Sequence, residues 1–260
     1  MYSKTLLICT TLLSFSCNSN SEAKNIDKTL KKEEEILSKY YPSIGAIPLP
    51  QNYTRSDTSS GTFAYWLRNI HLKKDKTVYQ YNGKRKWNQS AQFAVLDISV
   101  GDKDLQQCAD AVMRLRAEYL YSNKKFAAIT FKDNNGTAYK FTEPFTREHF
   151  NKYLERVFGM CGSASLSKEL KSIPVSDIQA GDVFIRGGFP GHAVLVVDVA
   201  KNDKGQKVYM LAQSYMPAQD IHILNNPADD DLSPWYEVND DDQIQTPEYV
   251  FTNKELKRWQ

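Results

Sequence analysis

The feature of this sequence that most restricts its fold is a set of short apolar runs in the second half of the chain. They cover residues 182–185, 192–199 and 207–214. A turn sequence at 202–205 joins the last two runs, and helix-like segments come before the runs rather than between them. Strands that follow one another in this way pair as an antiparallel meander, so the order predicts an α+β fold.

A helix is predicted over residues 105–122, upstream of these strands, with Cys108 near its start. Amides at a helix N-terminus favour negative charge, so we expect them to lower the thiol pKa from about 8.5 towards or below 7. His192 opens the second apolar strand, and an imidazole there can accept the thiol proton and later return it. The sequence therefore predicts that Cys108 and His192 act as a nucleophile and its base.

Amides close to the cysteine are candidates for stabilising an oxyanion. Gln107 directly precedes Cys108, and Gln106 and the backbone amide of Cys108 are the other candidates. A plain surface role for either glutamine is the alternative to a role in the site.

A third polar residue is expected to orient the imidazole of His192. Gln213, on the strand that follows, is the candidate, while a shifted alignment places Ala212 at that position and Gln219 is a substitute. Strict alternation along the strand predicts that Asp198 lies on the same side as His192.

Other segments carry local signals of secondary structure. Residues 127–131 and 138–141 flank Asn-Asn-Gly, which predicts a hairpin. Residues 78–81 and 92–98 are predicted to form a second hairpin that leads to the cysteine-bearing helix, and residues 63–67 fit either a helix or a strand. Helices are predicted at 146–158 and 165–170.

The N-terminus has the pattern of a lipoprotein signal. Lys4 precedes an apolar stretch at 5–15, and a small residue, Ser16, stands before Cys17, which is the predicted site of lipid attachment. The stretch is too short to span a bilayer as a mature helix, and plain secretion is the alternative. The predicted organisation is a signal with its lipid-bearing cysteine at 1–17, a polar tether and amphipathic helix at 18–41, and one domain at 42–260.

The cysteine count leaves one structural alternative open. Removal of the signal takes away Cys9 and lipid occupies Cys17, so only Cys108 and Cys161 remain. A disulfide between them is possible in an oxidising compartment, and inert buried thiols are a further alternative. A structural role is favoured for Cys161. It lies close before the strands of the second half, whereas the predicted nucleophile lies on a helix further upstream.

Charge and composition exclude some classes of function. The chain has 33 Lys and Arg against 31 Asp and Glu, without a dense basic stripe among aromatic residues, so nucleic-acid binding is not expected. The histidines and cysteines lack metal-ligand spacing, and the acidic runs at 229–231 and 240–242 lack the pattern of a calcium loop. We therefore expect no metal and no cofactor.

The cysteine and histidine segments resemble known families. Residues 178–185, 191–194 and 208–214 look like the core of NlpC-type cell-wall peptidases of the papain-like clan. A closer resemblance is to a family of bacterial lipoproteins, domain of unknown function 4846, and it covers the chain from about Tyr41 onwards. It is carried by residues 107–120, 181–198, 210–222 and 233–236. The resemblance implies a papain-like core, with the cysteine-bearing helix packed on an antiparallel sheet plus insertions.

These observations together predict a cell-envelope thiol hydrolase that cleaves an amide or ester bond. The resemblance and the signal imply that cell-wall peptides are its substrate class and that a lipid anchors it, with the outer membrane of a Gram-negative bacterium as the expected location. The alternative is a noncatalytic envelope-binding lipoprotein that keeps a papain-like groove without the chemistry.

Overall fold

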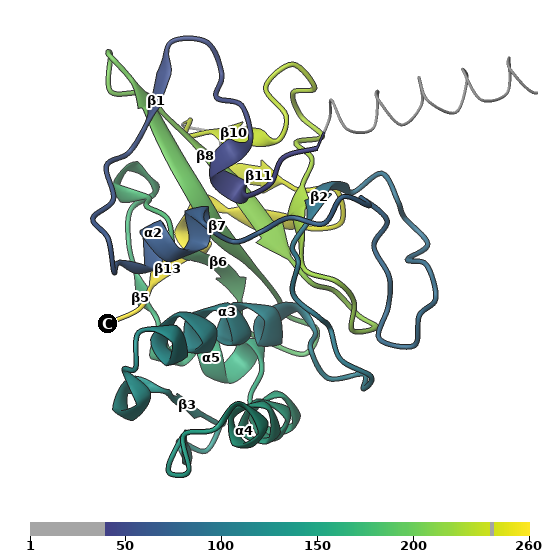
Figure 1. Cartoon of the computed structure of the whole chain (residues 1–260). Helices are drawn as coiled ribbons and strands as arrows, with labels where there is room; N and C mark the ends of the chain where they lie inside the picture. Colours follow the sequence, from purple (N-terminus) through teal and green to yellow (C-terminus); the bar gives the residue numbers. More distant parts are fainter. Residues whose placement is uncertain (1–39, 240–241) are drawn as a thin grey trace, which may run out of the picture. The chain divides into compact units, whose positions relative to one another are not determined.

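The centre of the molecule is a large antiparallel sheet formed mainly by the second half of the chain. The computed structural model describes residues 40–239 and 242–260. Its main sheet has nine strands, and the hydrogen-bonded order is β2-β9-β8-β7-β6-β13-β5. The three predicted strands are its middle: β6 (Val183–Arg186), β7 (His192–Asn202) and β8 (Lys207–Gln213). The predicted α+β class is confirmed, since four described helices accompany this sheet (Figure 1).

The predicted signal, Cys17 and nearly all of the 18–41 segment lie outside the described residues. Among the residues that are described, no helix has both the length and the apolar character needed to cross a membrane.

The edges of the sheet come from distant parts of the chain. β2 (Gln92–Val95) pairs with β9 (His222–Leu224), and β13 (Leu256–Arg258) lies between β6 and β5 (Lys171–Ser172). β1 (Tyr53–Arg55) pairs with β7, and β10 (Trp235–Glu237) pairs with β8.

The predicted hairpin between 78–81 and 92–98 is wrong. β2 instead adds to β9, where Ala94 and Val95 become buried, while Tyr79 and Gln80 form isolated bridges to Arg85 and Gln219. β2 therefore pairs with β9 rather than with the nearby 78–81 segment, because this pairing buries its apolar side chains in the main core.

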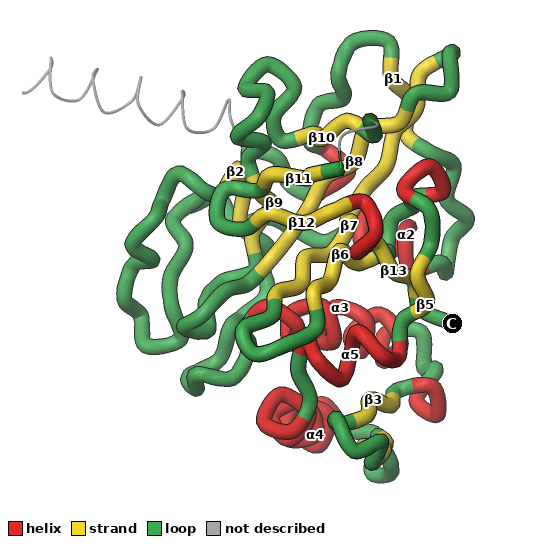
Figure 2. The backbone as a smooth tube through the Cα atoms, turned by 180° about the vertical axis from the view of Figure 1, so that it is seen from behind, coloured by secondary structure: helices red, strands yellow, loops and turns green. Residues whose placement is uncertain are grey.

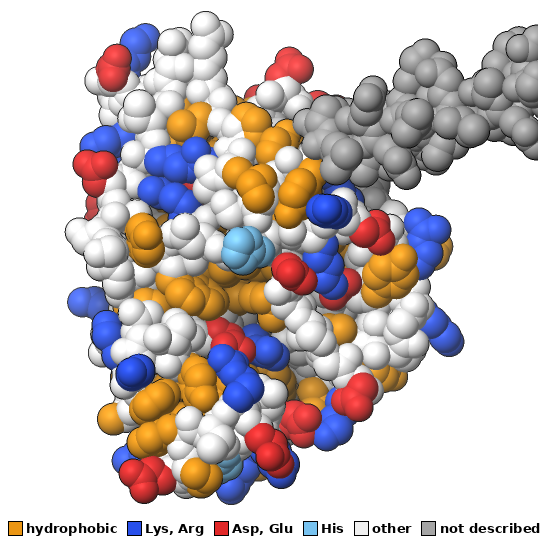
Figure 3. All heavy atoms as spheres, viewed as in Figure 1, with side chains coloured by type: hydrophobic (Ala, Val, Ile, Leu, Met, Phe, Trp, Pro, Cys, Tyr) orange, Lys and Arg blue, Asp and Glu red, His pale blue; other side chains and the backbone are white. Residues whose placement is uncertain are grey.

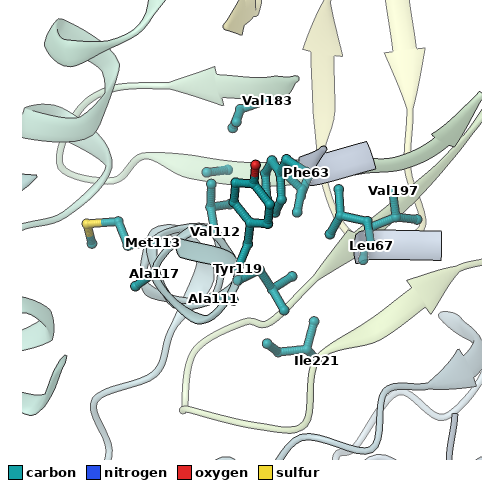
Figure 4. Close-up of a cluster of buried hydrophobic side chains, with 14 of the residues drawn as sticks. Phe63, Leu67, Ala111, Val112, Met113, Ala117, Tyr119, Val183, Val197 and Ile221 are labelled. Carbon is teal, nitrogen blue, oxygen red and sulfur yellow. The ribbon is translucent and has the colours of Figure 1, made fainter. Parts of the chain in front are cut away.

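Helix α3 (Cys108–Ser122) packs on the sheet through an apolar face. Ala111 and Val112 are buried there with Phe63 and Leu67 of α2 (Phe63–Arg68) (Figure 4), so the ambiguous run at 63–67 is a helix. Two further helices lie on the same side, α4 (Arg147–Met160) and α5 (Ser163–Glu169), and α4 packs on the side of α3 away from the sheet (Figure 1).

Strand β7 is buried on both faces. Ala193, Leu195 and Val197 belong to the core beneath α3, while Val194 and Val196 belong to a second core on the opposite face. The second core is covered by the hairpin of β11 (Gln243–Gln245) and β12 (Val250–Thr252), which lies in front of β7 and β8 in Figure 2.

A bulge in β7 overturns one sequence prediction. The register with β8 shifts between Val196 and Asp198, so strict alternation fails at this point. Asp198 leaves the face of His192 and pairs, fully buried, with Arg55 at 2.7 Å and Arg68 at 2.7 Å. A buried carboxylate needs such partners, and the bulge turns it towards them.

Smaller elements complete the described chain. The predicted hairpin around 134–136 is confirmed as β3 (Thr130–Lys132) with β4 (Ala138–Lys140). The described 3-10 turns are η1 (Ile44–Ala46), η2 (Phe126–Ala128), η3 (Val175–Asp177) and η4 (Asn253–Glu255). On the face in Figure 3, Lys and Arg side chains lie among Asp and Glu side chains.

Candidate active site

The start of α3 is fixed by its own first turn. The carboxylate of Asp110 accepts a hydrogen bond from the backbone N–H of Gln107 at 3.0 Å, and the carbonyl of Gln107 accepts the N–H of Ala111. The helix therefore begins at Cys108, later than the predicted residue 105. This places Cys108 at the end of the helix where free N–H groups point outwards.

The end of β8 holds this helix start in place. The hydroxyl of Ser214, directly after β8, lies 2.9 Å from the carbonyl oxygen of Gln106. The N–H of Ala218 donates to the carboxylate of Asp104 at 2.7 Å. Both contacts join the segment before Cys108 to the loop that follows Gln213, so the helix start and the sheet have a fixed relative position.

The sulfur of Cys108 lies beside the first residues of β7. The backbone N–H groups of Ala109 and Ala193 lie close enough to the sulfur to favour its thiolate form, and Ala193 directly follows His192. The structure therefore brings together the cysteine and the histidine, which are far apart in sequence. Cys108 itself is half-buried, so the site is not closed off from solvent.

His192 is held by an amide on one side and by aromatic rings on the others. Its Nε2 lies 2.9 Å from Oε1 of Gln213. Its ring centroid lies 4.9 Å from that of Tyr215, 4.8 Å from Tyr249 and 5.8 Å from Phe251. No hydrogen bond from the described residues engages Nδ1, so this nitrogen is the one available for a reacting group.

Burial controls the charge of both residues. It raises the pKa of Cys108, helped by the nearby Asp110 carboxylate, and the N–H groups around the sulfur only partly oppose it. Burial also lowers the pKa of His192 to about 4, against a weaker raising effect of Gln213. The expected low thiol pKa is therefore not found, because loss of water outweighs the helix amides. At neutral pH the resting pair is a thiol and a neutral imidazole.

A second group of polar side chains lies behind Gln213 and had no clear signal in the sequence. Nε2 of Gln213 donates to Oε2 of Glu248 at 2.8 Å, and the same oxygen accepts from Nζ of Lys86 at 2.5 Å. Nζ of Lys86 also lies 3.3 Å from Nε2 of His222, which is fully buried. These residues come from separate loops and from β9, and no local pattern marks them as neighbours.

The predicted oxyanion glutamines have other partners. The side-chain amide of Gln107 donates to Asp104 at 3.0 Å, and Oε1 of Gln106 accepts from Arg114 at 3.2 Å, while Nε2 of Gln106 is buried without a hydrogen-bond partner among the described residues. The backbone N–H groups of Cys108 and Ala109 lie near the sulfur and lower the thiol pKa. The helix start therefore supplies backbone donors near the sulfur, and no hydrogen bond within residues 40–239 and 242–260 joins either glutamine side chain to Cys108 or His192.

The alternatives to Gln213 lie away from the imidazole. Ala212 packs in the core beneath α3, opposite Leu195 of β7. Gln219 is buried, and its carbonyl oxygen lies 2.8 Å from the hydroxyl of Ser214. Of the three candidates, Gln213 is the one that contacts His192.

Cys161 is separate from this site. It ends α4 as a buried thiol of the core, and burial raises its pKa to about 12. Cys108 and Cys161 are both free thiols, without a disulfide between them. Within residues 40–239 and 242–260, no group of three or more His, Cys, Asp or Glu side chains is placed to hold a metal ion.

Comparison with known proteins gives a family for the chain. No curated protein and no solved structure matches it. A family model described as domain of unknown function 4846 matches residues 45–146 and 139–258, which is most of the chain. The matched ranges include the cysteine, the histidine and the residues around them. The chain therefore belongs to the domain of unknown function 4846 family.

Proposed function

We propose that this protein is a papain-like thiol hydrolase that cleaves an amide or ester bond in the cell envelope. The observation that carries the proposal is the position of the Cys108 sulfur on the N–H of Ala193, next to a histidine whose Nε2 contacts Gln213. A nucleophile, a base and a residue that orients the base are the parts that covalent acyl transfer requires.

The arrangement supports a stepwise reaction. Nδ1 of His192 takes the proton of the Cys108 thiol as the sulfur bonds to the substrate carbonyl carbon, and the backbone N–H of Cys108 donates to the developing oxyanion. Collapse of this intermediate breaks the carbon–nitrogen or carbon–oxygen bond, and His192 gives its proton to the leaving amine or alcohol. Water then attacks the thioester while His192 takes its proton, and the sulfur leaves and is protonated again.

The neutral resting pair is compatible with this order of events. A buried imidazole with a lowered pKa is unprotonated at pH 7 and can act as a base. The proton then moves as the sulfur attacks, rather than before the substrate arrives.

Location and substrate class belong to the same proposal. Cys17 after a short apolar stretch supports lipid attachment, and the NlpC-like segments support peptides of the cell wall as substrates. A membrane-anchored hydrolase would act on wall peptides within reach of its tether.

The test is hydrolysis of cell-wall fragments by the purified full-length protein, with products identified by mass spectrometry. We expect new fragments from the wild type, loss of at least about 10³-fold in rate for Cys108→Ala, and unchanged products for Cys161→Ala. Binding of the fragments without any cleavage, unchanged by Cys108→Ala, contradicts the proposal and supports the noncatalytic envelope-binding alternative.

A further inference from the structure

The side-chain amide of Gln213 can lie in either of two orientations, and its own chemistry favours neither. A glutamine amide carries an oxygen that accepts and an NH₂ group that donates, and the two ends have nearly the same shape. If the oxygen faces His192, the imidazole must carry its proton on Nε2. If the NH₂ group faces His192, Nε2 must be the acceptor, and the proton then lies on Nδ1, the nitrogen proposed as the base.

The groups on the far side of Gln213 fix the orientation of its amide. Its far end meets Oε2 of Glu248 at 2.8 Å and Nε2 of His222 at 3.5 Å. A carboxylate accepts only, so the NH₂ group must point to Glu248 and the oxygen must point to His192. The 2.9 Å contact between Oε1 of Gln213 and Nε2 of His192 is the result.

The hydrogen-bond partners of Glu248 and His222 are consistent with this orientation of the Gln213 amide. The ammonium of Lys86 donates only, and it contacts Oε2 of Glu248 at 2.5 Å and Nε2 of His222 at 3.3 Å. Nδ1 of His222 lies 2.9 Å from the carbonyl oxygen of Asp220, which can only accept. His222 therefore has its proton on Nδ1 and offers Nε2 as an acceptor to both Lys86 and Gln213.

We propose that the Lys86–Glu248 ion pair is a positioning device that sets the tautomer of His192, by fixing which end of the Gln213 amide faces the imidazole. The inference rests on the proposed function, because the tautomer matters for catalysis only if Nδ1 of His192 is the base. Lys86 and Glu248 do not touch the reacting atoms. Lys86 is 5% exposed and the Glu248 side chain 14% exposed, so water competes little for these hydrogen bonds.

The tautomer can be measured without any substrate. We would record long-range ¹H–¹⁵N correlations of the imidazole rings at pH 7 in the ¹⁵N-labelled full-length protein, with His192 assigned through a His192→Gln variant. The wild type is expected to show one His192 tautomer with the proton on Nε2. The titratable groups that surround this ring are Cys108, Tyr215, Tyr249, Glu248, Lys86 and His222.

Two variants at residue 248 distinguish the effect of its acceptor oxygen from the effect of its negative charge. Glu248→Leu removes the acceptor, so Gln213 is free to turn and a mixture of His192 tautomers is expected. Glu248→Gln keeps an acceptor oxygen that the Lys86 ammonium holds in place, so the wild-type tautomer is expected to return. The control is Glu118→Leu, which removes an ion-paired carboxylate of the same burial, 13% exposed, that contacts Arg114 and Arg147 instead.

Turnover gives a second measurement. In Glu248→Leu we expect kcat to fall by about 10² with little change in KM, and we expect Glu248→Gln and Glu118→Leu to stay within about threefold of the wild type.

The results separate this inference from the proposed function. A wild-type His192 with its proton on Nδ1, or a Glu248→Leu variant that keeps a single Nε2–H tautomer, overturns the inference even if the protein is a hydrolase. The first of these results comes from the wild-type protein, so it does not depend on whether a variant folds. The expected tautomers in a protein that cleaves no substrate would support the inference and overturn the hydrolase proposal alone.

Discussion

At the scale of single residues, burial has more influence on this site than the helix start does. The N–H groups around the Cys108 sulfur favour a thiolate, yet the loss of water raises the thiol pKa, and the same loss lowers the pKa of His192 to about 4. The two shifts act together, because each keeps its residue neutral. At neutral pH the proton of the resting pair therefore lies on the sulfur.

Alkylation by iodoacetamide across a pH series tests this state. We expect the labelling rate of Cys108 to rise with pH and to have its midpoint above the ordinary thiol pKa of about 8.5. Cys161, buried and with a pKa raised to about 12, is expected to react much more slowly. Equal labelling of both cysteines, or a midpoint below pH 7 for Cys108, would contradict this account.

The two buried histidines predict how stability depends on pH. Burial lowers the pKa of His192 to about 4 and that of His222 to about 3, from 6.5. Below pH 6.5 the unfolded chain therefore binds protons that the folded chain does not, and stability present above that pH is lost as the pH falls. Each histidine contributes a slope of up to about 1.4 kcal/mol per pH unit.

Urea unfolding between pH 7 and 5, compared between the wild type and a His192→Gln variant, measures the slope due to His192, because carboxyls whose pKa burial raises, such as Asp110, affect both proteins alike. Equal slopes for the two proteins from pH 6.5 to 5 would show that His192 is protonated in the folded protein.

At the scale of elements, the loop between β6 and β7 sets where His192 begins its strand. Gly191 lies in a gap without room for a side chain, because an added Cβ would overlap Oγ of Ser163 and lie 2.6 Å from the carbonyl oxygen of Arg186. One of these contacts is with backbone, which cannot rotate away. The glycine is therefore required by the close packing of this loop against the start of α5.

Gly191→Ala should destabilise the protein and displace His192. We expect the free energy of unfolding to fall by about 1 to 3 kcal/mol, because the loop must shift to admit the methyl group. Gly159→Ala is the matched control: an added Cβ there meets nothing within 4 Å, and alanine in helix α4 should stabilise by about 0.5 to 1 kcal/mol. Equal effects of the two substitutions in urea unfolding would contradict the packing argument.

The same scale shows which elements were predictable from sequence. The strands β6, β7 and β8, the β3–β4 hairpin and helix α4 have local signals in apolar periodicity and turn residues, and they form where expected. β2 was assigned the wrong partner, because its pairing with β9 depends on a buried surface more than 120 residues away along the chain. Strict alternation likewise could not predict the bulge before Asp198, because the bulge turns this residue towards two arginines that are distant in sequence.

At the scale of the whole molecule, one sheet separates two cores, and the candidate site lies where β7 begins. α3 covers one face and the β11–β12 hairpin covers the other. The helix brings Cys108 to β7 from one side, while the hairpin connection brings Glu248 and Tyr249 from the other. The site is therefore assembled from segments that enclose the end of a single strand.

Period, turn chemistry and residue type are local properties, so the amino-acid sequence was enough to predict the α+β class and the central strands, and it singled out residues 108 and 192 as a candidate pair. Gln213 was one candidate among several until its Oε1 was found 2.9 Å from His192. The charge state of this pair and the contacts of Lys86, Glu248 and His222 behind Gln213 could be read from the folded molecule alone. These depend on how much water the packed elements exclude and on which distant side chains meet, and neither is a property of any local stretch of chain.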